Sequence, residues 1–154
     1  MWQNGSIMST LFDDQDRQQV LDRIHRLKSD SSPLWGSMTV TKAACHMGDQ
    51  LAMALGEIEV RSSWRPEGLP LIREFIIYVM PWPKGVATAP ELLQTDLAEL
   101  DEARGRLTDL IDRFVERGAN GRLVPHSLFG KISNKTWGYL ALRHLDHHLR
   151  QFNV

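Results

Sequence analysis

The chain has 154 residues, of which 42% are hydrophobic and 24% are charged, and its 18 Lys and Arg nearly balance 19 Asp and Glu. A chain of this size and composition predicts one globular domain over residues 1–154, with a flexible N-terminus over residues 1–10 and a core that needs no structural metal or disulfide. The net charge of −1 argues against nucleic-acid binding, and the longest apolar run, residues 75–80, is too short to cross a membrane.

Apolar spacing predicts two helices in the first third of the chain. From about Asp13 to Lys28, apolar residues recur with the period of an amphipathic helix. Thr39 is suited to cap a second helix, because a threonine hydroxyl can accept a hydrogen bond from the first turn. This helix is expected to run to about Leu55 and to end at Gly56.

Three further elements are expected in the rest of the chain. The apolar segment between residues 70 and 81 favours a short helix over an extended segment. A capping box at Thr88 and Glu91 predicts that a long helix begins nearby and continues to Gly118. A cap signal at residues 133–134 starts the last helix. Together these elements predict an all-α fold, a four-helix bundle with an additional short helix or extended segment in a crossover.

The last predicted helix carries the strongest chemical signal, the stretch RHLDHHLRQF. Residues four apart lie on one face of a helix, so His144 and His148 can present two imidazoles to one metal ion. At about 100° per residue, both lie beside Trp137 on the inward flank, whereas His147 borders the polar side. We therefore choose His144 and His148, although inward-facing histidines are often satisfied by hydrogen bonds alone.

A metal site would need a third ligand from elsewhere in the chain. His25 lies on the polar flank of the first helix and is assigned to the surface. His46 lies about 125° from the centre of the apolar stripe of the second helix, so periodicity alone does not select it. His126 is a candidate proton carrier, or else a histidine that stabilises a turn or is exposed.

Two stretches of the sequence are similar to motifs of a known superfamily. WGSMTVTKAACHMGDQLAMALG resembles a second-helix motif in which a Trp-Gly-x-Met opening leads to one histidine. LFGKISNKTWGYLALRHLDHHLRQF resembles a closing motif in which a Phe-Gly turn precedes a helix with an HxxxH pair. Both motifs belong to the DinB-like superfamily of metal-binding four-helix bundles, and the second is typical of a branch of unknown activity.

The resemblance implies that His46, His144 and His148 are the metal ligands, at one end of a bundle that commonly forms a homodimer. Three histidines with an open fourth position suit a divalent ion, Zn or Ni first. Characterised members resemble metal-dependent thiol transferases or thiol-linked isomerases and hydrolases that use a low-molecular-weight thiol. We therefore expect a metal-dependent transferase or hydrolase acting on a small electrophilic molecule, with no nucleic-acid or membrane partner.

Several residues are expected near this site. Gln50 is a candidate pocket residue, and Trp137 either walls the pocket or packs in the core. Tryptophans in connections rich in Pro, Gly or Ser are expected to form a lid or a dimer surface: Trp35, Trp64 and Trp82. Carboxylates that could orient a ligand imidazole, with nothing in the sequence to choose among them, are Asp49, Glu57 and Asp146.

Two other functions are compatible with the sequence. One is a non-catalytic, stress-related dimer that binds a metal or ligand, because no acid or base is identifiable beside the site. The other is a bundle whose histidines only make hydrogen bonds. The single cysteine, Cys45, is expected to be an inert buried thiol, and a lone cysteine without a targeting signal indicates a cytoplasmic protein.

Overall fold

The computed structural model describes residues 9–61, 70–82, 84 and 88–154, so most of the predicted flexible N-terminus and Trp64 lie outside the described residues. The described residues form helices and no β-strand, which confirms the all-α prediction. No helix among them has the length and apolar content needed to cross a membrane. The helices are α1 (Asp14–His25), α2 (Val40–Leu55), α3 (Pro70–Tyr78), the 3₁₀-helix η2 (Pro90–Leu93), α4 (Leu100–Asn120) and α5 (Asn134–Gln151).

Helix α2 begins and ends where the sequence predicts. The Thr39 hydroxyl accepts a hydrogen bond from the Lys42 amide, and Gly56 ends the helix in the left-handed conformation with φ 82°. A residue with a side chain would be strained at that φ, and a Cβ on Gly56 would meet Val124 at 3.0 Å. Nearly every residue of α2 is buried, so this helix runs through the middle of the molecule.

Helix α1 is shorter than predicted. The Asp13 carboxylate caps its first turn, but the helix ends at His25 and does not reach Lys28. The amides of Arg26 and Leu27 instead bond to carbonyls three residues back. This tighter 3₁₀ pattern closes the last turn and directs the chain away from the helix axis.

The predicted start of the long helix at Thr88 and Glu91 is wrong. Residues 90–93 form only the short η2, and α4 begins at Leu100 and runs to Asn120, two residues past the predicted end. Segment 92–95, which comprises the end of η2 and the two residues after it, is hydrogen-bonded to α2. Tertiary hydrogen bonds therefore override the local capping signal.

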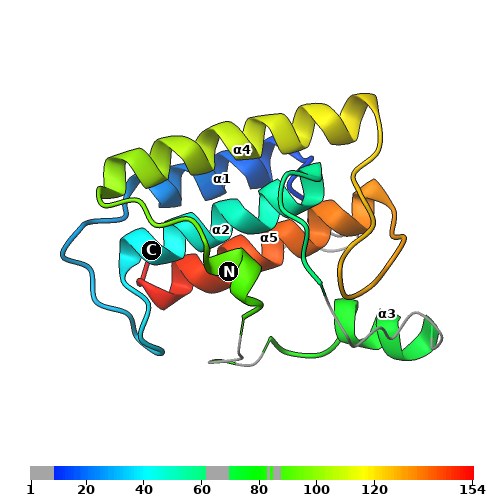
Figure 1. The fold of residues 1–154 in the computed structure, drawn as a ribbon, viewed down its shortest axis with the longest axis horizontal. Coiled ribbons are helices and arrows are strands. Elements are labelled where there is room, and N and C mark those ends of the chain that lie inside the picture. Colours follow the sequence, from blue (N-terminus) through cyan, green and yellow to red (C-terminus); the bar gives the residue numbers. More distant parts are fainter. Residues whose placement is uncertain (1–8, 62–69, 83, 85–87) are drawn as a thin grey trace.

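The Ser133 hydroxyl caps α5 by accepting from the Thr136 amide, as predicted. Figure 1 shows α3 apart from the four longer helices. Helix α3 is joined to α5 by a hydrogen bond of 3.0 Å between the hydroxyls of Tyr78 and Thr136.

One hydrophobic core joins the longer helices. Helix α2 packs against α4 and α5, and α1 packs against the same two helices from the other side of the core. Fully buried side chains from all four helices meet there, among them Ile24, Leu51, Phe114 and Leu145. A smaller cluster beneath α3 consists of Ile77, Phe129 and Leu140. This shared core fixes α2 and α5 relative to each other and so positions the histidines on these two helices.

Candidate metal-binding site

Helices α2 and α5 bring three buried histidines together. His46, His144 and His148 expose 4%, 6% and 7% of their surface. One ring nitrogen from each can be chosen so that all three lie within 4.8 Å of one another. The Nε2 atoms of His46 and His144 are 2.9 Å apart. This group could hold a metal ion.

The three rings pack edge to face. His144 and His148, one helical turn apart on α5, have ring centroids 4.7 Å apart. The His46 ring lies 4.7 Å from the first and 4.9 Å from the second. The i, i+4 spacing therefore brings two imidazoles together as expected, and α2 supplies a third from the opposite side.

The outward nitrogen of His46 is held by the main chain. Its Nδ1 lies 2.9 Å from the carbonyl oxygen of Leu92, which is one of the four residues of η2. Because a carbonyl can only accept, Nδ1 must carry the hydrogen and donate it. The Nε2 atom of His46 is then the lone-pair nitrogen, which is the form that a metal ligand needs.

His148 is oriented in the same way by a side chain. Its Nδ1 lies 2.8 Å from Oε1 of Gln151, and Nε2 of Gln151 donates to the carbonyl of Trp35 at 2.7 Å. The second bond fixes which end of the amide faces His148, so Nδ1 is the donor here too. Gly36 makes room for this amide, because a Cβ there would lie 3.1 Å from Nε2 of Gln151.

His144 differs from the other two histidines. Its Nδ1 is buried and, among the described residues, has no hydrogen-bond partner. Its Nε2 faces the lone pair on Nε2 of His46 at 2.9 Å, a distance at which two lone pairs would repel. A proton or a cation must therefore lie between these nitrogens, and the donor set fits a late first-row metal ion.

Burial keeps these imidazoles neutral. It lowers the pKa of His148 to about 4 and that of His144 well below its ordinary 6.5, with neighbouring histidines adding to both effects. The pKa of His46 is also lowered by burial, partly offset by its bond to Leu92 and by the charge of Asp49. Metal ligation requires neutral imidazoles, so the site is prepared for a cation at neutral pH.

Two of the tryptophans that are expected to form a lid or a dimer surface lie beside the histidines. The half-buried ring of Trp82 is 5.7 Å from His144 and 6.2 Å from His147. Trp35 packs edge-on against His147 at 5.5 Å, and Nζ of Lys84 lies 4.4 Å above the Trp35 ring. His147 itself is half-buried, at the rim of the site as expected.

Arg143 connects this aromatic rim to α3. Its guanidinium lies 5.4 Å from the Trp82 ring and donates to the carbonyls of Ile77 and Met80, the second at 2.9 Å. The end of α3 and the residues that lead from it to Trp82 are therefore fixed to α5. Trp82 is held at the site by the same helix that carries His144.

His126 and Trp137 have structural roles. Nδ1 of His126 accepts from the amides of Leu128 and Phe129 at 3.0 and 3.4 Å, so this nitrogen stabilises the turn. Burial lowers its pKa to about 4. Trp137 packs in the core, and its Nε1 donates to the Val124 carbonyl at 2.8 Å.

The remaining predicted residues are placed as follows. Gln50 is buried one turn after His46, with Oε1 unpartnered among the described residues. His25 is exposed, as expected, and Cys45 is a buried free thiol. Glu57 pairs with Arg113 near the far end of α2.

Among the candidate orienting carboxylates, Asp146 pairs with Arg23 and Arg150 at 2.7 and 2.8 Å. Asp49 is fully buried and bonds to Thr95 and Arg106. None of these bonds involves one of the three histidines. The groups that do orient a ligand imidazole, the Leu92 carbonyl and Gln151, are absent from the sequence prediction. The i, i+3 spacing of His148 and Gln151 is a signal that could have found the second; nothing in the sequence marks the first.

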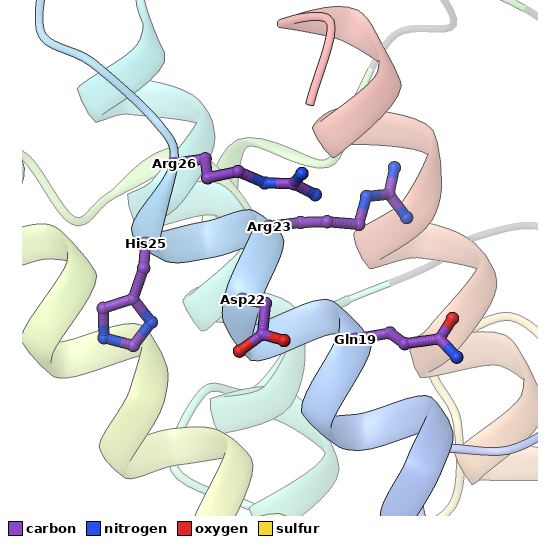
Figure 2. A pocket seen from close by; sticks show the side chains of 5 residues that line it. All are labelled: Gln19, Asp22, Arg23, His25 and Arg26. Atoms are coloured by element: carbon purple, nitrogen blue, oxygen red, sulfur yellow. The ribbon is translucent and has the colours of Figure 1, made fainter.

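A surface hollow elsewhere follows α1 and is lined by Gln19, Asp22, Arg23, His25 and Arg26. Figure 2 shows the side chains of Gln19 and Arg23 pointing to one side of the helix and His25 to the other. Arg23 is already bonded to Asp146 and to the Val154 carbonyl. These side chains do not converge on a point, so the histidine cluster is the better candidate site.

Residues 81–154 match a family described as a protein of unknown function, DUF1569. The matched part contains α4 and α5, and so includes His144 and His148 but not His46. Comparisons with curated proteins and with solved structures gave no match. The family match agrees with a helical domain and assigns no activity.

Proposed function

We propose that this protein binds one divalent metal ion, Zn or Ni, through His46, His144 and His148, in a four-helix bundle of the DinB-like type. The observation that carries the proposal is the 2.9 Å approach of two Nε2 atoms, one of which must present a lone pair. The lowered pKa values and the outer bonds of His46 and His148 support it. The site would be a functional one, because the core does not need an ion for folding.

We propose that the metal-loaded protein is a transferase or hydrolase that acts on a small electrophilic molecule, with a low-molecular-weight thiol as co-substrate. A divalent ion with three imidazole ligands and an open position would lower the pKa of a bound thiol or water. The chain's own residues would orient the ligands through Leu92 and Gln151. The rings of Trp35 and Trp82 would border the substrate and reduce its exposure to water.

A homodimer in the cytoplasm is part of the same proposal. Exposed apolar side chains on one short helix support association, since such patches commonly mark interaction surfaces. On α3 they include Leu71 with 87% of its surface exposed and Phe75 with 52%. Analytical ultracentrifugation at micromolar concentration should give a species of twice the chain mass. A monomer at all concentrations would exclude the dimer.

A non-catalytic metal-binding or sensing protein is the second candidate. It is favoured by three ionisable groups near the site that already have partners. Asp49 is paired with Arg106, Asp146 is paired with Arg23, and His126 is occupied by backbone amides. These bonds engage both carboxylates and Nδ1 of His126, which leaves fewer groups to carry a proton to or from a substrate.

Metal titration tests the binding proposal. The protein is purified without a histidine tag, stripped of metal with a chelator and titrated with Co²⁺. It should bind one ion per chain and show the visible absorption of Co²⁺ with few ligands. His46→Ala, His144→Ala and His148→Ala should each abolish stoichiometric binding, whereas the matched control His25→Ala should not. Wild-type protein that takes up no stoichiometric metal would overturn the proposal.

A second assay separates the two candidate functions. The Zn- and Ni-loaded proteins are tested for thiol transfer to a chlorinated dinitrobenzene with several small thiols, and for ester hydrolysis. Turnover that is lost in His148→Ala supports the enzyme. Stoichiometric metal binding with no turnover in either assay supports the non-catalytic protein.

A further inference from the structure

The bond that orients His46 ends on a main-chain carbonyl outside any long helix. Leu92 belongs to η2, a single turn that does not continue into α4. Whatever fixes this turn and the residues after it therefore fixes the partner of Nδ1 of His46. The relevant contacts are those of segment 92–95 with α2.

Three residues on one face of α2 bond to this segment. Lys42, one turn before His46, donates from Nζ to the carbonyls of Leu93 and Thr95 at 2.8 and 3.0 Å. Asp49, nearly one turn after His46, accepts from the Thr95 hydroxyl at 2.5 Å and from its amide at 3.3 Å. The bond from His46 to the segment lies between these two anchors along the helix.

The Asp49 carboxylate is buried where it makes this contact. Its side chain is fully buried, and Oδ1 also accepts from Arg106 on α4 at 2.8 Å. A buried carboxylate is costly unless its oxygens are bonded, and here both are. Gly48 leaves space for the arginine, since a Cβ there would lie 2.6 Å from its Nη1 atom.

We propose that Asp49 is a positioning residue of the histidine site, which acts through Thr95 by holding segment 92–95 so that the Leu92 carbonyl accepts the Nδ1 hydrogen of His46. This inference rests on the proposed metal site for its functional meaning. The carboxylate does not touch the imidazole that it positions; the connection passes from Asp49 through Thr95 and back along the chain to Leu92.

A purely structural role is the alternative, in which Asp49 only joins α2 to α4 through Arg106. Thr95→Val separates the two roles. It removes the hydroxyl that bonds to Asp49, keeps the branched shape, and leaves the Asp49–Arg106 pair in place. Thr108→Val is the matched control, because the half-buried Thr108 hydroxyl bonds to the carbonyl of Arg104 in its own helix and to no other group in the described part of the chain.

The first readout is the tautomer of His46 in metal-free protein, from long-range ¹H–¹⁵N spectra of the imidazoles. Wild type and Thr95→Ser should show one tautomer, with the hydrogen on Nδ1. Thr95→Val should show a mixture of both tautomers, and Thr108→Val should match wild type. The second readout is Co²⁺ affinity, which should fall about 10–100-fold in Thr95→Val and recover in Thr95→Ser.

An unchanged tautomer and affinity in Thr95→Val would overturn the inference, as would equal changes in Thr95→Val and Thr108→Val. If Thr95→Val does not fold, Thr95→Ala, which removes the same hydroxyl, is measured in its place, with the same expected and contradicting results. The tautomer is read without metal. Suppose that wild type binds no metal, but His46 has a single tautomer in wild type and a mixture in Thr95→Val. This result would refute the proposed function and support the positioning role.

Discussion

The Nε2 atoms of His46 and His144 lie 2.9 Å apart, although 98 positions separate the residues in the chain. Since His46 donates from Nδ1 to Leu92, the hydrogen between the two Nε2 atoms must belong to His144 when no metal is bound. A bound ion would take its place.

This relationship predicts a tautomer change in one histidine only. On addition of Zn²⁺ to the metal-free protein, the hydrogen of His144 should move from Nε2 to Nδ1, while His46 and His148 keep theirs on Nδ1. Long-range ¹H–¹⁵N spectra before and after titration measure this directly. A His144 resonance that keeps the Nε2 hydrogen in the zinc-saturated protein would contradict the assigned ligand atoms.

The relay from His148 through Gln151 to Trp35 predicts a second effect on metal affinity. Gln151→Met keeps the side-chain length but removes the acceptor for Nδ1 of His148. We expect Co²⁺ affinity to fall about 10–100-fold, because the ligand ring loses its orienting bond. Gln19→Met on the exposed face of α1 is the control, and equal affinities in the two variants would show that Gln151 does not orient the ring.

Two glycines should respond in opposite ways to alanine. Gly36 has φ 74° and faces Gln151, so Gly36→Ala should lower the free energy of unfolding by roughly 1–2 kcal/mol and weaken metal binding. Gly105 lies in α4 with open space at its Cβ position. Gly105→Ala should therefore raise the free energy of unfolding by about 0.5–1 kcal/mol. Urea denaturation measures both changes. A Gly36→Ala variant with an unchanged free energy of unfolding would contradict the close approach to Gln151.

Buried His126 predicts how acid affects the metal-free protein. Its pKa is lowered to about 4 by burial, from an ordinary value of 6.5. Between these values the unfolded chain binds a proton that the folded chain does not. The free energy of unfolding should therefore fall as the pH decreases through this window, by up to about 1.4 kcal/mol per pH unit for this histidine.

His126→Asn isolates this contribution. The asparagine Oδ1 can accept from the same two backbone amides as Nδ1 of the histidine, but it does not titrate. Urea denaturation of both proteins from pH 7 to pH 5 should give a smaller pH dependence for the variant. Equal slopes would mean that His126 is not neutral and buried in the folded protein.

Local signals predicted the helix ends that are satisfied locally. The sequence correctly predicts the helix ends at Thr39, Gly56 and Ser133, because each of these residues caps its helix through contacts or a backbone conformation within one turn. The start of α4 was wrong because the bonds that hold Thr95 come from α2, far away in the sequence. A capping box cannot report such a contact.

The site shows the same division. The HxxxH spacing is local and placed His144 and His148 together correctly. His46 could not be selected from periodicity, because both the apolar face and the polar face of α2 are buried, the second against segment 92–95 and the histidines of α5. Only the resemblance to the DinB-like superfamily indicated His46. The Leu92 carbonyl leaves no trace in a sequence, since every residue has one.

Anomalous diffraction from crystals grown with Zn²⁺ tests the central claim most directly. Data collected on both sides of the zinc edge should show one strong peak per chain, bonded to Nε2 of His46, His144 and His148 at about 2.0–2.1 Å. The absence of a peak between these imidazoles in zinc-saturated crystals, or a peak held by other residues, would contradict the metal site.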